Sequence, residues 1–276
     1  MSGWELSLVA DPQQELDGAA LSGIATCTQE SQIARLPMAS ARTGLSLVVS
    51  DLFRIRQCTT DSIVIQGNLS FLHRIGSEWS LRSLLIEGSV GSGLGVNMRS
   101  GQIEVRGHTA AYAAQQLRGG TLRIQGDTGD YLGAPLPGRR SGMSGGRVIV
   151  SGNAGHHAGH RMRRGVMLVA GQCGAGVASD MVAGTIAIGG EVGERVAAGM
   201  KRGTLILARQ SALDTRRFAC SRPSPLGITR LLAADFCKDV PQIADALVWP
   251  AQRFLGDRSC GGQGEIWQLQ NLGDAE

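Results

Sequence analysis

The stretch Gly152-Asn-Ala-Gly155-His-His-Ala-Gly-His-Arg-Met162-Arg-Arg-Gly165-Val-Met-Leu-Val-Ala-Gly171 decides the fold, because the chain on both sides repeats it. Most units are 19 residues long, while one spans 21 residues and one spans 26. The consensus is G-x-x-G-x-x-x-(A/G)-x-x-M-x-x-G-x-φ-x-φ-x-G, where φ is aliphatic, and its glycines begin units at positions 67, 88, 107, 126, 152, 171 and 190. A fixed period near 20 residues is typical of a solenoid.

Each unit contains a short alternating segment between glycines, which predicts a strand. Examples are residues 103–105, 122–124, 148–150 and 186–188. The rest of the unit has no helical apolar stripe and too many glycines, each of which costs a helix about 1 kcal/mol. A left-handed hexapeptide solenoid would need a period divisible by six, and calcium-binding nonapeptide coils would need an aspartate in each turn. The sequence therefore predicts an all-β fold, a right-handed parallel β-helix of about eight coils.

The repeat divides the chain into three expected parts. Residues 1–61 contain alternating pieces at 4–9 and 45–49 separated by irregular sequence, and we expect them to cap the first coil. Residues 62–208 hold the repeats. Residues 209–276 form a C-terminal cap or tail, with helical spacing from Ile228 to Phe236 and from Val240 to Leu247, and a final strand at 264–269.

Composition excludes several classes of protein. The chain has 276 residues, 42% of them hydrophobic, with neither an 18-residue apolar run nor a basic start followed by one, so we expect no membrane helix, no signal peptide and a cytoplasmic location. Its six cysteines form no C-x-x-C pair, which disfavours zinc, iron–sulfur clusters and a disulfide framework. The net charge is only +4, and Tyr112 and Tyr131 are the only aromatic residues between 83 and 208, so nucleic-acid binding is disfavoured.

The unit after Gly126 is longer than the others and places extra residues before Met143. Pro135 and Pro137 predict a stiff, protruding loop tipped by Arg139 and Arg140. Insertions in solenoids go to loops on one side, which is often the binding side. The loop is therefore either a tolerated surface insertion or a binding element.

The outward-facing strand column is charged in the middle and apolar toward both ends. In its C-terminal part it carries Ile149, Leu168, Ala187 and Ile206. An exposed contiguous apolar surface usually marks an interface. Either the C-terminal helices cover these residues, or a partner protein does.

Candidate catalytic and metal-binding groups are sparse. His156, His157 and His160 are close in sequence, yet their unit contains no Asp, Glu or Cys, and adjacent histidines in an extended chain point to opposite sides. Asp127 and Asp130 could form a carboxylate pair, but polysaccharide chemistry on a β-helix needs several more carboxylates and bases. We therefore assign neither a catalytic residue nor a metal site, and interpret the histidines as turn or contact residues.

Basic residues follow the methionine column in four units of six. They are Arg99, Arg118, Arg163 and Lys201. Stacked like charges repel one another unless solvent or an anion screens them. This basic column is either a solvated face or a track for an acidic polymer or an acidic subunit surface.

The segments D-L-F-R-I (51–55), G-M-S-G-G-R-V-I-V-S-G-N-A-G (142–155), H-R-M-R-R-G (160–165), M-V-A-G-T-I (181–186) and M-K-R-G-T-L (200–205) support a family resemblance. The chain resembles the C subunit of formylmethanofuran dehydrogenase and, more closely, the C subunit of the bacterial formyltransferase/hydrolase complex, over residues 45–208. Similar coils occur in the C-terminal domain of the glutamate synthase large subunit. The length, the long unit before Gly142 and the D-L-F segment favour the C subunit family.

The resemblance implies a non-catalytic scaffold in one-carbon metabolism. Its partners would be an amidohydrolase-like A subunit, a B subunit and a formyltransferase D subunit. The complex would pass a formyl group from formyl-tetrahydromethanopterin to a methanofuran-type carrier and hydrolyse it to formate, with no cofactor bound by this chain alone. Such carriers bear glutamate chains, which the basic column would help to hold. Ala110 and Leu117 depart from the repeat in one coil, and His156 and His157 stand where the family often has acidic residues.

Three alternatives remain open from the sequence. One is the C subunit of an archaeal-type formylmethanofuran dehydrogenase. Another is a stand-alone β-helical carbohydrate-active enzyme, which requires a groove of converging carboxylates. The third is a detached domain similar to that of glutamate synthase.

Overall fold

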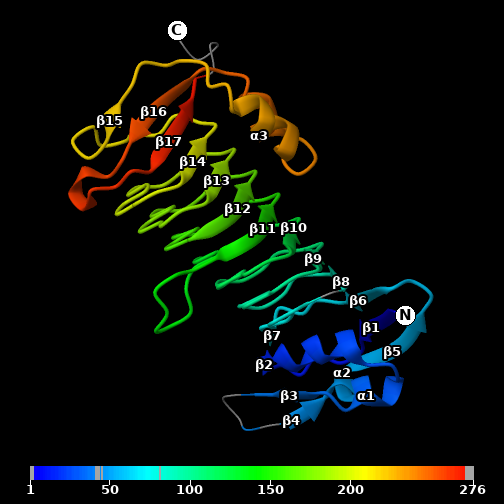
Figure 1. Cartoon of the computed structure of the whole chain (residues 1–276). Coiled ribbons are helices and arrows are strands. Elements are labelled where there is room, and N and C mark those ends of the chain that lie inside the picture. The colour runs from blue at the N-terminus through cyan, green and yellow to red at the C-terminus, as the bar shows by residue number, and fades with distance from the viewer. Residues whose placement is uncertain (1–2, 41–43, 45, 81, 271–276) are drawn as a thin grey trace.

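The computed structural model describes residues 3–40, 44, 46–80 and 82–270. Strands dominate it, and the chain runs from its N-terminal segment to its C-terminal segment along the length of a stack of similar units (Figure 1). The strands of the stack are β6 (Ser62–Gln66), β8 (Ser83–Glu87), β9 (Gln102–Val105), β10 (Thr121–Ile124), β11 (Ser144–Val150), β12 (Arg164–Val169), β13 (Thr185–Ile188) and β14 (Thr204–Leu207). The strand segments that the sequence predicts at 103–105, 122–124, 148–150 and 186–188 are confirmed.

The units stack with equivalent strand residues in register, apart from one shift. Neighbouring strands from β6 to β14 pair in parallel, and equivalent residues such as Ile186 and Leu205 lie opposite one another. Among these strands, β11 contains a register shift, between Ser144 and Arg147. A second column of parallel bridges joins Leu69, Val90, Thr109, Thr128, Ala154, Cys173 and Val192. The 19-residue spacing thus places equivalent residues of successive units against each other at two separate points of each unit.

The strands have two buried faces toward the C-terminal end of the stack. Residues such as Leu205 and Leu207 point into the main core, which also holds the methionine column. The alternate positions of the last four strands point to the opposite face of the sheet, into a second core. They hold Ile149, Leu168, Ala187 and Ile206. Helices α3 (Thr229–Phe236) and α4 (Pro241–Ala246) cover that second core, and α3 lies beside the C-terminal strands of the stack in Figure 1.

Both ends of the main sheet are extended by strands that do not follow the repeat. At the N-terminal end, β1 (Gly3–Leu8) pairs in parallel with β6 and antiparallel with β5 (Phe53–Cys58). At the other end, β17 (Glu265–Leu269) pairs in parallel with β14, followed by β16 (Ala251–Leu255) and β15 (Ala219–Cys220). The two predicted C-terminal helices and the final strand are confirmed, while residues 271–276 of the predicted tail lie outside the described residues.

The N-terminal segment contains more regular structure than the sequence predicts. Residues 19–34, expected to be irregular, form the 3₁₀ helix η1 (Ala19–Thr26) and helix α1 (Glu30–Ala34), which bury Leu21, Ile24 and Ile33. The remaining elements are β2 (Leu16–Asp17), β3 (Pro37–Ala39), β4 (Ser46–Val48), α2 (Val49–Leu52), β7 (Leu72–His73) and η2 (Arg258–Cys260). Leu45, which the sequence places in an alternating piece, lies outside the described residues. No helix in the described part of the chain has the length and apolar character needed to span a bilayer.

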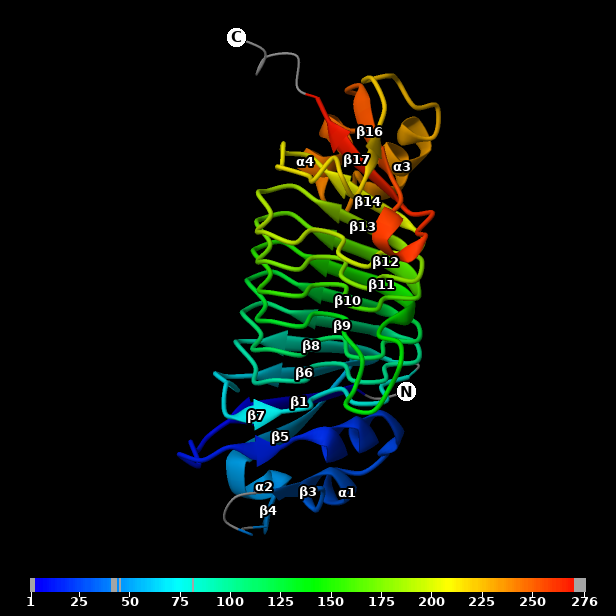
Figure 2. The same cartoon turned by 90° about the vertical axis from the view of Figure 1, so that its left-hand side faces the viewer.

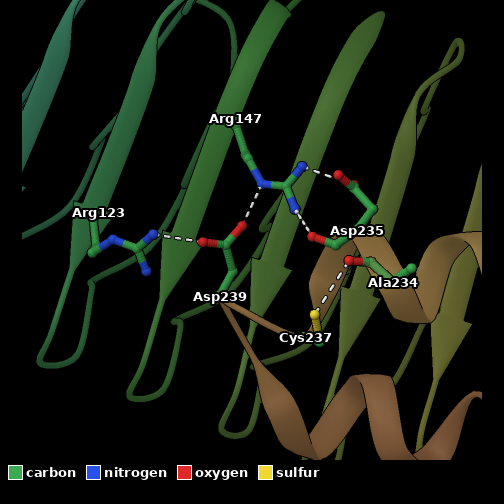
Figure 3. Close-up of polar contacts among 6 residues, drawn as sticks. All are labelled: Arg123, Arg147, Ala234, Asp235, Cys237 and Asp239. Carbon is green, nitrogen blue, oxygen red and sulfur yellow. Dashed lines mark hydrogen bonds and ion pairs between the residues drawn. The ribbon is translucent and has the colours of Figure 1, made fainter.

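A cluster of ion pairs fastens the C-terminal helices to the stack (Figure 3). Arg123 of β10 and Arg147 of β11 both bind Asp239, at 2.5 Å and 2.6 Å between nitrogen and oxygen. Arg147 also binds the carboxylate of Asp235 at 2.9 Å, and its guanidinium lies 5.7 Å from the centroid of the Phe236 ring. The Asp239 side chain is only 14% exposed, so this pairing is less screened by solvent than a surface ion pair.

A second buried carboxylate fastens the chain near η2. Asp257 is fully buried and accepts hydrogen bonds from Arg217, from Ser259 (backbone N–H, 3.0 Å; hydroxyl, 2.6 Å) and from the backbone N–H of Gly199 (2.8 Å). Burial alone would raise the pKa of Asp257. The hydrogen bonds to Arg217, Ser259 and Gly199 outweigh that effect and hold the pKa well below its usual range.

Replacing Asp239 should loosen the C-terminal helices. Asp239→Ala leaves two arginines without their shared partner, and hydrogen bonds to charged groups are each worth about 1.5–3 kcal/mol. We expect the free energy of unfolding to fall by about that amount, and hydrogen exchange at residues 229–247 to accelerate. Asp245→Ala, at an exposed position of α4, is the control. Equal effects of the two substitutions would show that the cluster does not fasten the helices.

Asp257 should make the free energy of unfolding depend on pH in the acidic range. Since its pKa is lower in the folded chain than in the unfolded one, its contribution is complete above the ordinary aspartate pKa of about 4 and is lost as the pH falls below it. Breaking a buried pair costs about 3–5 kcal/mol, so Asp257→Asn should lower the free energy of unfolding by about 3 kcal/mol at neutral pH. Urea unfolding between about pH 6 and pH 3 should show this difference shrinking toward low pH. A difference that stays constant would contradict the assignment.

Candidate functional site

The basic column is exposed but not continuous. The backbone N–H groups of Arg118, Arg163 and Lys201 each donate to the carbonyl of a core residue in the preceding unit, so the three side chains lie in one row. Ser144 and Val182 occupy the intervening positions of that row. Only Arg99 and Arg118 come from consecutive units, so the predicted repulsion between like charges is confined to that pair.

Three members of the basic column have no carboxylate partner. Arg99 pairs with Glu78 at 3.1 Å. Within the described ranges, no ion pair involves Arg118, Arg163 or Lys201. These three side chains are therefore available to an external anion.

The long unit forms a loop with an exposed tip. Pro135 and Leu136 are half-buried, whereas Arg139 and Arg140 are exposed, as the sequence predicts. The side-chain amides of Gln115 and Gln116 donate to the carbonyls of Pro135 and Ser141, both at 3.1 Å, and hold the two ends of the loop. The loop, green in Figure 2, extends from the stack toward the N-terminal units.

The apolar column is not available to a partner. Ile149, Leu168 and Ile206 are fully buried, in one cluster with residues of α3 and α4. Of the two alternatives, the chain's own C-terminal helices provide the cover. An interface role for these three residues is therefore corrected to an internal one.

The candidate carboxylates are turn residues. One carboxylate oxygen of Asp127 accepts hydrogen bonds from the backbone N–H of Asn153 at 2.7 Å and from its side chain at 3.1 Å. Asp130 accepts in the same way from the backbone N–H of His156 at 2.7 Å. Each carboxylate thus bridges one unit to the next, which is an architectural role.

The three histidines also have separate contacts. Nδ1 of His156 accepts from the backbone N–H of Ala175 at 3.0 Å. His157 stacks on Tyr131, and Nδ1 of His160 lies 2.9 Å from the hydroxyl of Ser179. Among the described residues, no group of three or more His, Cys, Asp or Glu side chains could hold a metal ion.

Two titratable groups of the stack are shifted toward their neutral forms. Burial, with a smaller contribution from the positive charge of Arg161, lowers the pKa of His160. Burial raises the pKa of the Cys173 thiol to about 12, which keeps it protonated and unreactive. The Cys173 thiol therefore lacks the environment of a nucleophile, and Nδ1 of His160 is engaged with the hydroxyl of Ser179.

Sequence reasoning missed a ladder of stacked rings beside the loop. Tyr112 and Tyr131 stack with centroids 5.4 Å apart, and Tyr131 and His157 stack at 4.9 Å. The signal was present, because each residue lies five positions after the glycine that begins its unit. The ladder borders two cavities of about 550 Å³ and 340 Å³, which share Tyr112, Gln115 and Leu136 as lining residues.

Sequence comparison identifies a relative over a limited stretch. No family model matches the chain. A curated protein of Methylorubrum extorquens, the C subunit of the formyltransferase/hydrolase complex Fhc, is 37% identical over 75 residues, which make up 27% of this chain and 26% of that protein. The aligned stretch thus spans about a quarter of the curated relative.

Structural comparison extends the similarity to the whole chain. One chain of the X-ray crystal structure of the formyltransferase/hydrolase complex (FhcABCD) from Methylorubrum extorquens, in complex with methylofuran, superposes with a TM-score of 0.89 and 34% identity. The match covers 97% of this chain and 100% of that one, and the solved assembly is a hetero-oligomer. The chain therefore belongs to the family of the Fhc C subunit of formyltransferase/hydrolase complexes.

Proposed function

We propose that the chain is a non-catalytic scaffold subunit of a formyltransferase/hydrolase complex. Its partners are an amidohydrolase-like A subunit, a B subunit and a formyltransferase D subunit. Those subunits pass a formyl group from formyl-tetrahydromethanopterin to a methanofuran-type carrier and then hydrolyse it to formate. This chain holds them in place and binds no cofactor by itself.

The observation that carries this proposal is the end-to-end match to a chain of the FhcABCD complex, which was solved with methylofuran. A second observation argues against a stand-alone carbohydrate enzyme. Asp127 and Asp130 each accept hydrogen bonds from the following unit. A general acid or a nucleophile needs a carboxylate directed at a substrate, and these two are engaged elsewhere.

We propose that the fold is a right-handed parallel β-helix with three parts. Residues 1–61 cap one end, residues 62–208 form the coils, and residues 209–276 cap the other end. The parallel pairing from β6 to β14 and the second column of bridges support this description. Both sheet edges of the coils are paired by strands from outside the repeat, which is what a solenoid cap does.

We also propose that the basic column binds an acidic chain. Arg118, Arg163 and Lys201 are exposed and lack carboxylate partners among the described residues. The candidates are the glutamate chain of the methanofuran-type carrier and an acidic surface of a partner protein. Arg139 and Arg140 at the loop tip would add to the same attraction, which acts over about 10 Å at 0.1 M salt.

The scaffold role should be visible in the native assembly. We expect affinity purification of the tagged chain from its source cells to recover a large complex, with an amidohydrolase-like and a formyltransferase-like chain identified by mass spectrometry. The isolated chain should neither transfer nor hydrolyse formyl groups, whereas the complex should do both. Recovery as a monomer, or formyl transfer or hydrolysis by the chain alone, would refute the proposal.

Charge reversal should show whether binding depends on the basic column or only on the net charge of the surface. In Arg118→Glu/Arg163→Glu, we expect either the carrier content of the complex or its content of partner proteins to fall at least severalfold, and more steeply at low salt, because opposed charges attract less under screening. Arg216→Glu/Arg222→Glu makes the same change of net charge at exposed positions off the column. If both double variants assemble and retain carrier like the unmodified chain, the column is only a solvated face.

A further inference from the structure

The ring ladder belongs to a column of residues with left-handed backbone. Arg74, Gly93, Tyr112, Tyr131, His157, Gly176 and Arg195 all have φ between 58° and 76°. The N–H groups from position 74 to position 176 donate to equivalent carbonyls of the next unit, so these residues are rungs of one column. A left-handed backbone costs a residue other than glycine roughly 1–2 kcal/mol, so the rungs that are not glycine hold this conformation at a cost.

Three consecutive rungs carry rings, and the ladder closes differently at its two ends. At the far end the His157 ring lies over Gly176, where an added Cβ would come within 2.6 Å of its Nδ1 atom. At the near end Tyr112 faces the rung of Gly93, where no ring is present. An added Cβ at Gly93 would lie 3.2 Å from Arg74 Cγ, 3.5 Å from Val96 Cγ2 and 3.8 Å from Arg74 Cα, so the aliphatic part of Arg74 lies over this rung but no ring does. We call this rung, which carries no ring, the open rung.

The charged end of Arg74, the neighbouring rung, is directed away from Tyr112. The Arg74 guanidinium binds Asp17 at 2.8 Å and makes no cation–π contact with Tyr112 among the described residues. Tyr112 is 43% exposed. The cavity of about 340 Å³ lies here, lined by Tyr112, Gly93, Arg74, Val96 and Asn97. Its volume is in the range of small-molecule sites.

The surroundings of the open rung have no acidic lining residue and include an unused acceptor. Neither this cavity nor the adjoining one of about 550 Å³ has an Asp or Glu in its lining, whereas Arg74, Arg139 and Arg161 line the two cavities. Arg139 has no ion-pair partner within the described part of the chain, while Arg161 is 3.6 Å from Asp180. The buried oxygen Oδ1 of Asn97 accepts no hydrogen bond from any described residue. A buried polar atom of this kind ordinarily has a partner.

We propose that the hollow over Gly93 is a binding site for a small planar aromatic anion. The ring of the ligand stacks on the free face of Tyr112 and continues the ladder at the rung where the chain itself has only glycine. Its anionic group lies toward Arg139, and a ring N–H or O–H suits the free oxygen of Asn97. This site is separate from the basic column and from the scaffold role, so either can fail without the other.

The site can be tested by placing a tyrosine of the chain itself at position 93, where it would occupy the open rung. The probe is 2-naphthoate, titrated into the full-length chain and followed by NMR of the ligand. We expect saturable one-to-one binding that Gly93→Tyr abolishes, because Tyr112 and Tyr131 show that this column accepts tyrosine. Tyr112→Ala should weaken binding about two- to twelvefold, the range of an aromatic pair. Gly261→Tyr places a tyrosine at another left-handed glycine in open space and should bind like the unmodified chain.

Two results would overturn the proposal. One is binding to Gly93→Tyr that equals binding to the unmodified chain, provided that its circular dichroism and melting temperature show it to be folded. The other is the absence of saturable binding to the unmodified chain. Two further comparisons test the requirement for a negative charge. In one, the neutral 2-naphthylmethanol replaces 2-naphthoate, and in the other, Arg139→Gln replaces the unmodified chain. We expect each change to weaken binding severalfold, and equal affinity for the two probes would refute an anion site.

Discussion

Successive units approach so closely at one corner that no side chain fits between them. A Cβ added to Gly107 would lie 2.5 Å from the carbonyl carbon of Gly88, and one added to Gly190 would lie 2.6 Å from that of Gly171. At another corner the methyl groups of Met143 and Met162 rest against Gly165 and Gly184 of the following unit. Hydrogen bonds between units form only at a close distance, and glycine at these corners permits the approach on which every other stacked contact depends.

Much of the fold could be predicted from the sequence alone. Strands, their register and the two C-terminal helices follow from alternation and helical spacing, which are local patterns. The fastening of α3 was not predictable in the same way, because Arg147 and Asp239 are 92 positions apart and their meeting depends on how the helices lie on the sheet. The helices in residues 19–34 lack the long apolar stripe by which a helix is recognised, since only a few of their residues are buried.

In the candidate site, too, some features follow from the local sequence and others depend on tertiary packing. Exposure of Arg118, Arg163 and Arg139 follows from their positions in turns, whereas the burial of Ile149, Leu168 and Ile206 depends on which of two covers is present. The ring ladder escapes sequence reasoning for another reason. Aromatic residues are rare in the repeats, and their rarity argues against nucleic-acid binding, although the column position of Tyr112 and Tyr131 is the informative feature. In a repeat, a departure from the consensus at one aligned position is informative when the next units share it.

The strand that completes the main sheet comes from far along the chain. β17 pairs with β14, but residues 208–264 separate the two strands. During synthesis, the edge of β14 therefore stays open while those residues emerge from the ribosome, and it closes only after β17 has emerged as well. Until then, a nascent chain presents the backbone of β14 to any neighbouring strand, including one from another copy on the same messenger RNA.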